Sequence, residues 1–515
     1  MTGTLGLRAH DRGAAPSDGG EDPGHVRIVI VGSGFAGIGL AIRLKQAGIE
    51  DFVVLERAGD VGGTWQANTY PGCQCDVPSH LYSFSFAPNP GWTRTYSRQP
   101  EIRAYLRDCA ERYGLVPHLR FGHELTGATW NEERARWRVE TSGGALDATL
   151  LIDATGPLSQ PAVPRIRGLN RFEGTIFHSA AWDHDHDLAG ERVAVIGTGA
   201  SAIQFVPRIQ PRVGALHVFQ RTAPWILPHT DRPTSRLERR LYRALPLAQR
   251  AVRTAIYWSR EALVIGFAKR PRMARPLERV GRQHLRRQVR DPQLRRRLRP
   301  DFHVGCKRIL ISNDWYPALA KPNVELVTEP IREIAGRRIV LDDGSAREVD
   351  TIILGTGFHV TDPPTAWLVR GRDGRTLAEA AGPSPQAYLG TAMPGFPNLF
   401  KVIGPNTGLG HSSMVFMIES QIAYVMDAIR QMDERAIASV DVRPDAVVAF
   451  NAELQEKMKG TVWSSGCASW YLDARGRNTT LWPDFTFRFR RRTRRFDADA
   501  YELRTGVAEP AVAAP

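Results

Sequence analysis

Short β-branched runs that end in glycine-rich turns are the clearest pattern of apolar and polar positions in this 515-residue chain. Residues 27–31 (RIVIV) lead directly into GSGFAG at 32–37. Apolar residues then recur with the spacing of an amphipathic helix as far as Ala47, and a second apolar run fills 52–55 before Glu56. The pattern predicts a strand, a tight turn, a helix and a second strand.

The three glycines of the first turn have separate tasks in a dinucleotide-binding unit. Gly32 makes the tight turn, Gly34 lets the backbone approach a pyrophosphate, and Gly37 lets the helix pack on the strand. The helix N-terminus supplies amides and a partial positive charge for the phosphates. Since Glu56 can accept hydrogen bonds from both ribose hydroxyls of an adenosine, the unit predicts a nucleotide with a free ribose.

The same construction recurs at 192–196 (RVAVI), which runs into GTGASA and is followed by a helix and a strand over 215–219. Gly197 and Arg221 are 24 positions apart, as are Gly32 and Glu56. A carboxylate would repel a 2′-phosphate, whereas a guanidinium pairs with it, so the second site is expected to prefer NADP over NAD. Its expected residues are Gly197, Thr198, Gly199, Ala200, Ser201, Ala202, Arg221 and Thr222.

Two such sites in one chain suggest hydride transfer from NADPH to a bound flavin. The segments 150–156 (LLIDATG) and 351–357 (TIILGTG) each carry apolar residues into a small-residue turn, which is typical of a chain crossing between two domains. We predict an α/β fold with two Rossmann-like dinucleotide-binding domains. The expected parts are an FAD domain at 26–160 and 350–505, an NADP domain inserted at 161–349 with a helical insertion at about 231–300, and disordered tails at 1–25 and 506–515.

Composition narrows the class of protein. The chain is 42% hydrophobic with five cysteines, and it contains no CxxC pair, which argues against a disulfide scaffold, a zinc knuckle or a dithiol reductase. The most apolar segment, 28–42, is short for a bilayer span, so we expect a cytoplasmic protein without an integral membrane segment. Residues 255–268 are also apolar, and we interpret them as a buried helix, with a membrane-touching helix as the alternative.

The formal net charge of +14 leaves nucleic-acid or anionic-membrane binding open. Basic runs occur at 282–299, expected as a solvated helix, and at 488–495. The second run alternates with Phe485, Phe487 and Phe489, which predicts a half-buried strand. Because no nucleic-acid-binding motif accompanies either run, we expect no nucleic-acid partner.

From residue 172 to residue 183 the chain reads FEGTIFHSAAWD, and this segment resembles the FxGxxxHxxxW motif of type I Baeyer–Villiger monooxygenases, which are class B flavoprotein monooxygenases. The related N- and S-oxygenating flavin monooxygenases usually have Tyr or Phe at the position of Trp182. The resemblance implies that His178 couples domain movement to catalysis, although a lone histidine is more often a packing residue. His184 and His186, in DHDHD, are more simply a solvated turn than a metal site.

Other segments resemble the same family. The resemblance implies that Arg308, in GCKR, is the catalytic arginine and that Asp76 orients it. It also implies that Lys307 joins Arg221 on the 2′-phosphate. The chain departs from the family at Gln74, where arginine is usual, and at Pro157, where a polar residue is common. The remaining implied contacts are Thr64, Trp65, Asp76, Tyr82 and Met414 with FAD, and Trp470 with NADP.

The activity implied by the resemblance is insertion of one oxygen atom from O2 beside a ketone carbonyl, through a flavin C4a-peroxide formed with FAD and NADPH. The expected partners are O2 and a small ketone or heteroatom substrate. An N- or S-oxygenating monooxygenase is the nearest alternative. A plain NADPH-dependent flavin reductase is a third possibility, but its usual dithiol is absent.

Overall fold

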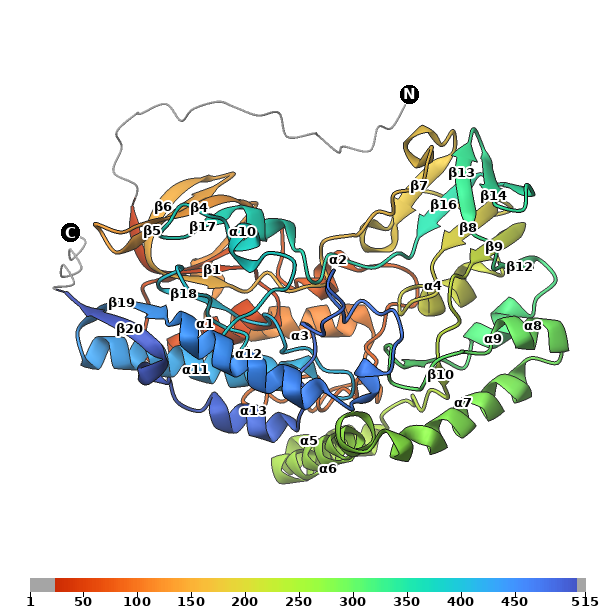
Figure 1. Cartoon of the computed structure of the whole chain (residues 1–515). Helices are drawn as coiled ribbons and strands as arrows, with labels where there is room; N and C mark the ends of the chain where they lie inside the picture. Colours follow the sequence, from red (N-terminus) through yellow and green to blue (C-terminus); the bar gives the residue numbers. More distant parts are fainter. Residues whose placement is uncertain (1–23, 507–515) are drawn as a thin grey trace.

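The computed structural model describes residues 24–506. The predicted tails lie outside the described residues except at their inner borders, where His25 already belongs to the first strand. Figure 1 shows two sheet-containing bodies side by side, with a row of helices along the lower edge of the second. The chain crosses from one body to the other and back. Among the described residues, no helix is long and apolar enough to cross a membrane.

The first body contains an eight-stranded mixed sheet in the order β17-β4-β5-β6-β1-β2-β3, with β18 paired to β6. β1 pairs in parallel with β2 and β6, and the C-terminal halves of these three strands are buried, as expected for a sheet covered on both faces. Helices α1 (Phe35–Gln46), α3 (Gln99–Arg112) and α11 (Met414–Glu434) pack beside it. The strands are β1 His25–Val31, β2 Phe52–Glu56, β3 Leu119–Phe121, β4 Leu125–Asn131, β5 Arg136–Thr141, β6 Gly144–Asp153, β17 Val369–Arg370 and β18 Leu399–Lys401.

The second body contains a parallel five-stranded sheet in the order β12-β9-β8-β16-β7. Helices α4 (Ala202–Ile209) and α9 (Trp315–Leu319) pack against it. Its strands are β7 Thr175–His178, β8 Arg192–Ile196, β9 Ala215–Phe219, β12 Val324–Val327 and β16 Thr351–Leu354, and an antiparallel sheet adds β13 Ile331–Ala335, β14 Arg338–Leu341 and β15 Ala346–Glu348. The expected α/β class with two Rossmann-like units is confirmed.

One predicted boundary differs from the structure. A division at residue 350 assigns β16 to the FAD domain, but β16 pairs in parallel with β7 and β8 of the second sheet. The return crossing therefore follows Leu354. The apolar run at 351–354 does not reveal which sheet it joins, because a strand buried on both faces has the same composition in either one.

The helical insertion lies between two short strands that pair with each other, β10 (Ile226–Leu227) and β11 (Leu310–Ile311). This pairing returns the chain to the interface between the bodies, directly after residues 307 and 308. Its helices are α5 Arg236–Ala244, α6 Pro246–Val264, α7 Arg275–Gln288 and α8 Pro292–Arg297. The C-terminal part adds α12 Pro444–Met458, α13 Thr486–Arg492, β19 Ile437–Val442 and β20 Tyr501–Thr505.

One local prediction is wrong, and another is confirmed only in part. The basic run expected as a strand is helix α13, in which Thr486 and Phe489 are buried and Phe487 is 40% exposed. Phe at every second position from 485 to 489 fits a strand. In a helix, however, Phe485 and Phe489 are about one turn apart and lie on the same side, which here faces the protein. The segment 255–268 is helical as expected but only partly buried: Val264 and Phe267 are buried, whereas Trp258 is 55% and Ile265 37% exposed.

We predict that Gly37→Ala destabilises the first body. A Cβ at this position would lie 1.9 Å from the carbonyl oxygen of Gly32, which belongs to the backbone and cannot move aside cheaply. The free energy of unfolding, measured with denaturant, should fall by about 3 kcal/mol or more. Gly59→Ala is the control, since a Cβ there meets nothing within 4 Å. Equal midpoints for the two variants would contradict this account of the turn.

Candidate active site

The first glycine turn exposes backbone without side chains at the N-terminus of α1. Gly32 has φ +105°, a conformation that favours glycine. A Cβ at Gly63 would lie 2.9 Å from Cα of Gly34, so the two backbones face each other without side chains between them. Glu56, at the end of β2, accepts hydrogen bonds on Oε2 from the amide (2.9 Å) and hydroxyl (2.7 Å) of Ser33. The predicted adenosine-binding carboxylate is thus fixed beside the turn.

The second turn has the same backbone form and a basic environment. Gly197 has φ +112°, and a Cβ at Gly199 would meet only open space. Burial lowers the pKa of Lys307, and the nearby charge of Arg221 lowers it further. The Lys307 Nζ also lies 4.8 Å from the centroid of the Phe302 ring. The structure therefore brings the two predicted cations together although 86 positions separate them in the sequence, as a 2′-phosphate site requires.

Both turns open onto one continuous cavity of about 2440 Å³ between the two bodies. Its wall contains all of the predicted site residues except Gly37 and Ala202. Gly37 instead faces the backbone of its own turn, and Ala202 is fully buried. These two positions thus allow helix and strand to approach closely, which is the task assigned to the third position of such a turn.

Arg308 lies in this cavity with its guanidinium held on two sides. Its Nε and Nη2 donate to Oδ2 of Asp76 at 3.0 and 2.5 Å, and its Nη1 donates to the carbonyl oxygen of Leu409 at 3.0 Å. The side chains of Arg308 and Asp76 are 26% and 28% exposed. Burial alone would lower the pKa of Arg308, but the charge of Asp76 outweighs burial and raises it, so the cation is permanent.

Aromatic side chains surround the same space. The indole Nε1 of Trp65 donates to the hydroxyl of Tyr82 at 3.2 Å, and their rings are 5.6 Å apart in an edge-to-face arrangement. Met414 begins α11 and lines the cavity. Trp470 also lines it but is 49% exposed, with its ring 4.5 Å from that of Tyr471. The cavity therefore has a fixed aromatic wall and a solvent-exposed tryptophan at its border.

Three hydroxyls in the cavity wall indicate that the wall fits a polar cofactor. The side-chain oxygens of Ser412, Thr479 and Thr480 are buried without a hydrogen-bond partner, although all three residues line the cavity. Buried polar groups normally find partners. Together with the exposed backbone of the two glycine turns, these hydroxyls offer hydrogen bonds to FAD and NADP.

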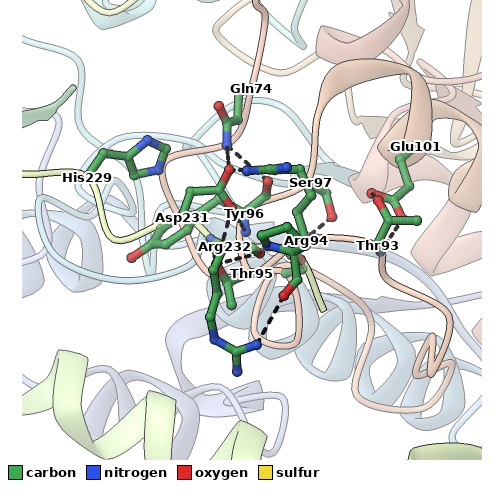
Figure 2. Close-up of polar contacts among 12 residues, drawn as sticks. Gln74, Thr93, Arg94, Thr95, Tyr96, Ser97, Glu101, His229, Asp231 and Arg232 are labelled. Atoms are coloured by element: carbon green, nitrogen blue, oxygen red, sulfur yellow. Dashed lines mark hydrogen bonds and ion pairs between the residues drawn. The ribbon is translucent and has the colours of Figure 1, made fainter. Parts of the chain in front are cut away.

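Sequence reasoning missed a cluster that joins the insertion to the first body. Figure 2 shows Gln74, Arg94 and Tyr96 directed at Asp231, which precedes α5. Asp231 accepts from Arg94 Nε at 2.6 Å, Gln74 Nε2 at 3.2 Å and the amide of Tyr96 at 3.2 Å. Burial would raise the pKa of Asp231, but the hydrogen bonds from Arg94 and Tyr96 hold it below its ordinary value. Gln74, where the family usually has arginine, was the one signal in the sequence.

The motif at 172–183 lies beside the crossing between the bodies. His178 is buried, and its Nδ1 accepts a hydrogen bond from the amide of Ala180 at 3.0 Å. Burial lowers the pKa of His178 to about 4, so the ring is neutral at neutral pH. The ring of Trp182 packs 5.1 Å from Phe177 and 5.2 Å from Phe205. His178 does not line the cavity, and its contacts are those of a packing residue.

The two histidines of DHDHD have separate partners. His184 Nε2 lies 2.8 Å from the hydroxyl of Thr69, and His186 Nε2 lies 2.8 Å from that of Thr351. Within residues 24–506, no group of three or more His, Cys, Asp or Glu side chains is arranged to hold a metal ion.

A disulfide joins Cys306 to Cys467, with their Cα atoms 6.3 Å apart. It links the segment that carries Arg308 to the segment that carries Trp470 across a sequence separation of 161 residues. Cysteine counting gave no sign of this bond, because pairing depends on proximity in the fold rather than on spacing. The hydroxyl of Ser465 lies 3.2 Å from Sγ of Cys306, and Cys306 is fully buried.

Two dinucleotide turns opening on one cavity, one with Glu56 and one with Arg221, define a pyridine-nucleotide-dependent flavoprotein oxidoreductase. Residues 29–245 match the family model described as "Pyridine nucleotide-disulphide oxidoreductase". The chain is 54% identical to a Baeyer–Villiger monooxygenase of Streptomyces coelicolor over 93% of each chain.

Solved structures agree with this likeness. A closed cyclohexanone monooxygenase is similar with a TM-score of 0.84 and 28% identity, and OTEMO in complex with FAD and NADP with 0.83 and 26%. Each match covers 94% of this chain and 100% of the other. The chain belongs to the Baeyer–Villiger monooxygenase family.

We predict that the disulfide contributes measurably to stability. Opening a cross-link that closes so long a loop should reduce the free energy of unfolding by about 2–5 kcal/mol. Thermal unfolding of Cys467→Ser should therefore begin at a lower temperature than that of the unaltered chain. Because Cys306 is buried in the folded chain, the reductant is added to chain unfolded in denaturant and kept through refolding. Dithiothreitol used in this way should lower the midpoint of the unaltered chain to that of the variant and leave the variant unchanged. An unaltered chain that is insensitive to the reductant would contradict the prediction.

Proposed function

We propose that this chain is an NADPH- and O2-dependent Baeyer–Villiger monooxygenase in which Arg308 is the catalytic residue and Asp76 positions it. The observation that carries the proposal is the guanidinium of Arg308, held by Asp76 and Leu409 in the cavity onto which both dinucleotide turns open. The reaction inserts one oxygen atom beside a ketone carbonyl and yields an ester or lactone.

The cofactor contacts follow from the two turns. Gly32, Gly34 and Glu56 would hold the adenosine half of FAD, and the turn at 197–202 would hold NADP with Arg221 and Lys307 on its 2′-phosphate. Bound FAD supplies the redox chemistry by accepting a hydride from NADPH and activating dioxygen. The FAD contacts nearer the reaction centre are proposed to be Thr64, Trp65, Tyr82 and Met414.

Arg308 supplies a fixed positive charge for the oxyanion that develops on the carbonyl oxygen of the substrate. Because Asp76 and Leu409 occupy three of its donor positions, the guanidinium cannot swing away, and little reorganisation is needed during reaction. Asp76 also compensates the charge, which would otherwise be costly in a partly desolvated cavity. Trp470, at the exposed border, would cover the cavity and exclude water when the nucleotide is bound.

The same proposal includes a small ketone substrate and a cytoplasmic location. Disulfides are uncommon in cytosolic proteins, where thiols are kept reduced. Full burial of Cys306 limits the access of such reductants to the bond that the structure contains.

The function is tested by a product assay under ¹⁸O2. Purified protein with FAD and NADPH would be offered cyclohexanone, linear and aryl ketones, a steroid ketone and several sulfides, and mass spectrometry would follow the label. Esters or lactones with one labelled oxygen atom are expected. Sulfoxides without esters would point to heteroatom oxygenation instead. Hydrogen peroxide as the sole product from every substrate would contradict the proposal for this panel.

We predict that Arg308→Ala lowers the rate of ketone oxygenation by about 10²-fold or more, because the developing oxyanion loses its cation. Bound flavin, measured by absorbance, should be unchanged. Arg332→Ala, at a half-exposed arginine outside the cavity, is the matched control. Ketone oxygenation by Arg308→Ala within threefold of the control would exclude the assigned role.

We predict that Arg221→Gln raises KM for NADPH by about tenfold to a hundredfold, the loss expected for a charged hydrogen bond. KM for NADH should stay the same, because NADH has no 2′-phosphate. Stopped-flow measurement of flavin reduction with each nucleotide separates the two effects. An equal rise in KM for NADPH and NADH would show that Arg221 does not bind the 2′-phosphate.

A further inference from the structure

The net positive charge of this protein is concentrated in the helical insertion. Residues 231–300 contain 21 Arg and Lys but only five Asp and Glu. This excess of 16 exceeds the net charge of +14 for the whole chain, so the remaining residues together are slightly acidic. Figure 1 shows the helices of this segment along one edge of the molecule, so the excess of basic residues belongs to elements on that edge.

Helix α5 exposes leucines on the same outer side. Leu237 and Leu241 are 77% and 46% exposed, and their spacing of four residues places them on one face of α5. Leu245, which directly follows the helix, is 49% exposed. Tyr242 turns inward and is 8% exposed. Arginines at 236, 240 and 243 are exposed beside the leucines. The helix thus presents an apolar stripe flanked by cations.

Helix α6 reverses the usual amphipathic arrangement over most of its length. Its Arg250 is exposed, but from Ala251 to Ala262 every exposed position is uncharged, and Trp258 is 55% exposed. The charged side chains face the protein instead. Arg253 donates to the carbonyl oxygens of His80 and Ser83, and the buried Glu261 accepts from the hydroxyl and amide of Thr486.

The apolar face of α6 continues at both ends. Leu247 is 66% exposed at its start, next to α5, and the ring of Phe487 from α13 lies 6.0 Å from that of Trp258. Large apolar side chains exposed together on neighbouring helices are typical of an interaction site.

The positive charge of this surface indicates which partner it can bind. A second copy of the chain would bring two strongly basic surfaces together, and like charges across an interface are unfavourable. The phosphates of a nucleic acid would pair with the arginines, but they make no favourable contact with the exposed leucines and tryptophan. An anionic bilayer satisfies both features, since its headgroups pair with arginine and its acyl boundary accepts apolar side chains.

We propose that α5 and α6 form a peripheral docking surface for an anionic phospholipid bilayer. The leucines of α5, Leu247 and Trp258 enter the headgroup boundary, and Arg236, Arg240 and Arg243 contact lipid phosphates. The proposed contact is peripheral: the side chains of this surface reach the headgroup region, and neither helix crosses the bilayer. This surface is separate from the cavity, whose wall contains none of these residues.

The test is co-sedimentation of the full-length, flavin-loaded protein with sucrose-loaded vesicles. Vesicles of phosphatidylglycerol and phosphatidylcholine in equal parts should carry the protein into the pellet, and vesicles of phosphatidylcholine alone should not. Leu237→Ser, Leu241→Ser and Leu247→Ser combined should lower the partition coefficient at least tenfold. The matched control combines Val116→Ser, Val163→Ser and Val448→Ser, which alter exposed valines elsewhere and should bind normally.

Two triple variants with the same change in net charge distinguish the effect of the arginines on α5 from that of the overall charge. Arg236→Glu, Arg240→Glu and Arg243→Glu combined should abolish binding, whereas the same change at Arg120, Arg171 and Arg338 should leave most of it. An unchanged flavin spectrum and circular dichroism spectrum would establish that each variant is folded.

Several outcomes would overturn the proposal. Failure of the unaltered protein to bind the anionic vesicles would do so, and so would full binding by the leucine variant. Dimers that form without lipid and dissociate on the leucine substitutions would assign the face to a second copy. Salt-sensitive binding to duplex DNA that ignores the leucine substitutions, without vesicle binding, would assign it to nucleic acid.

Discussion

The ion pair between Arg308 and Asp76 is the contact on which the arrangement of the site depends. Its partners are 232 residues apart and come from different parts of the chain. A partly buried pair of this kind is favourable only when the remaining donors are satisfied, and here Leu409 accepts the free edge of the guanidinium. The pair therefore requires three segments to meet at one place, and the short β10–β11 ladder returns the chain from the insertion to that place.

The two glycine turns show how one backbone device serves two ligands. Both hold their first glycine at positive φ, at +105° and +112°, and both line the cavity with backbone that carries no side chain at the glycines. The residue 24 positions later differs, as Glu56 in one unit and Arg221 in the other. A change of charge at one position thus accounts for the proposed division between FAD and NADP, because a 2′-phosphate requires a cation.

Two further contacts between distant segments were missed by sequence reasoning. Asp231 ties the insertion to the loop that carries Arg94 and Tyr96, and the Cys306–Cys467 disulfide ties the Arg308 segment to the Trp470 segment. Neither has a local pattern, since an aspartate before a helix and two separated cysteines are common features. The two helices α6 and α13 were misread for a related reason, because a short apolar pattern does not state which side faces the protein.

The sequence by itself determined the two strand–turn–helix units, their class of ligand and the candidate residues, because glycine turns and buried strands are local features with fixed spacing. Tertiary structure alone decided that β16 joins the second sheet and that Ala202, expected among the NADP contacts, is buried outside the cavity wall. It also decided that the apolar side of α6 faces outward. Each of these depends on which distant segments meet, and that is set by the packing of the whole chain rather than by any local pattern.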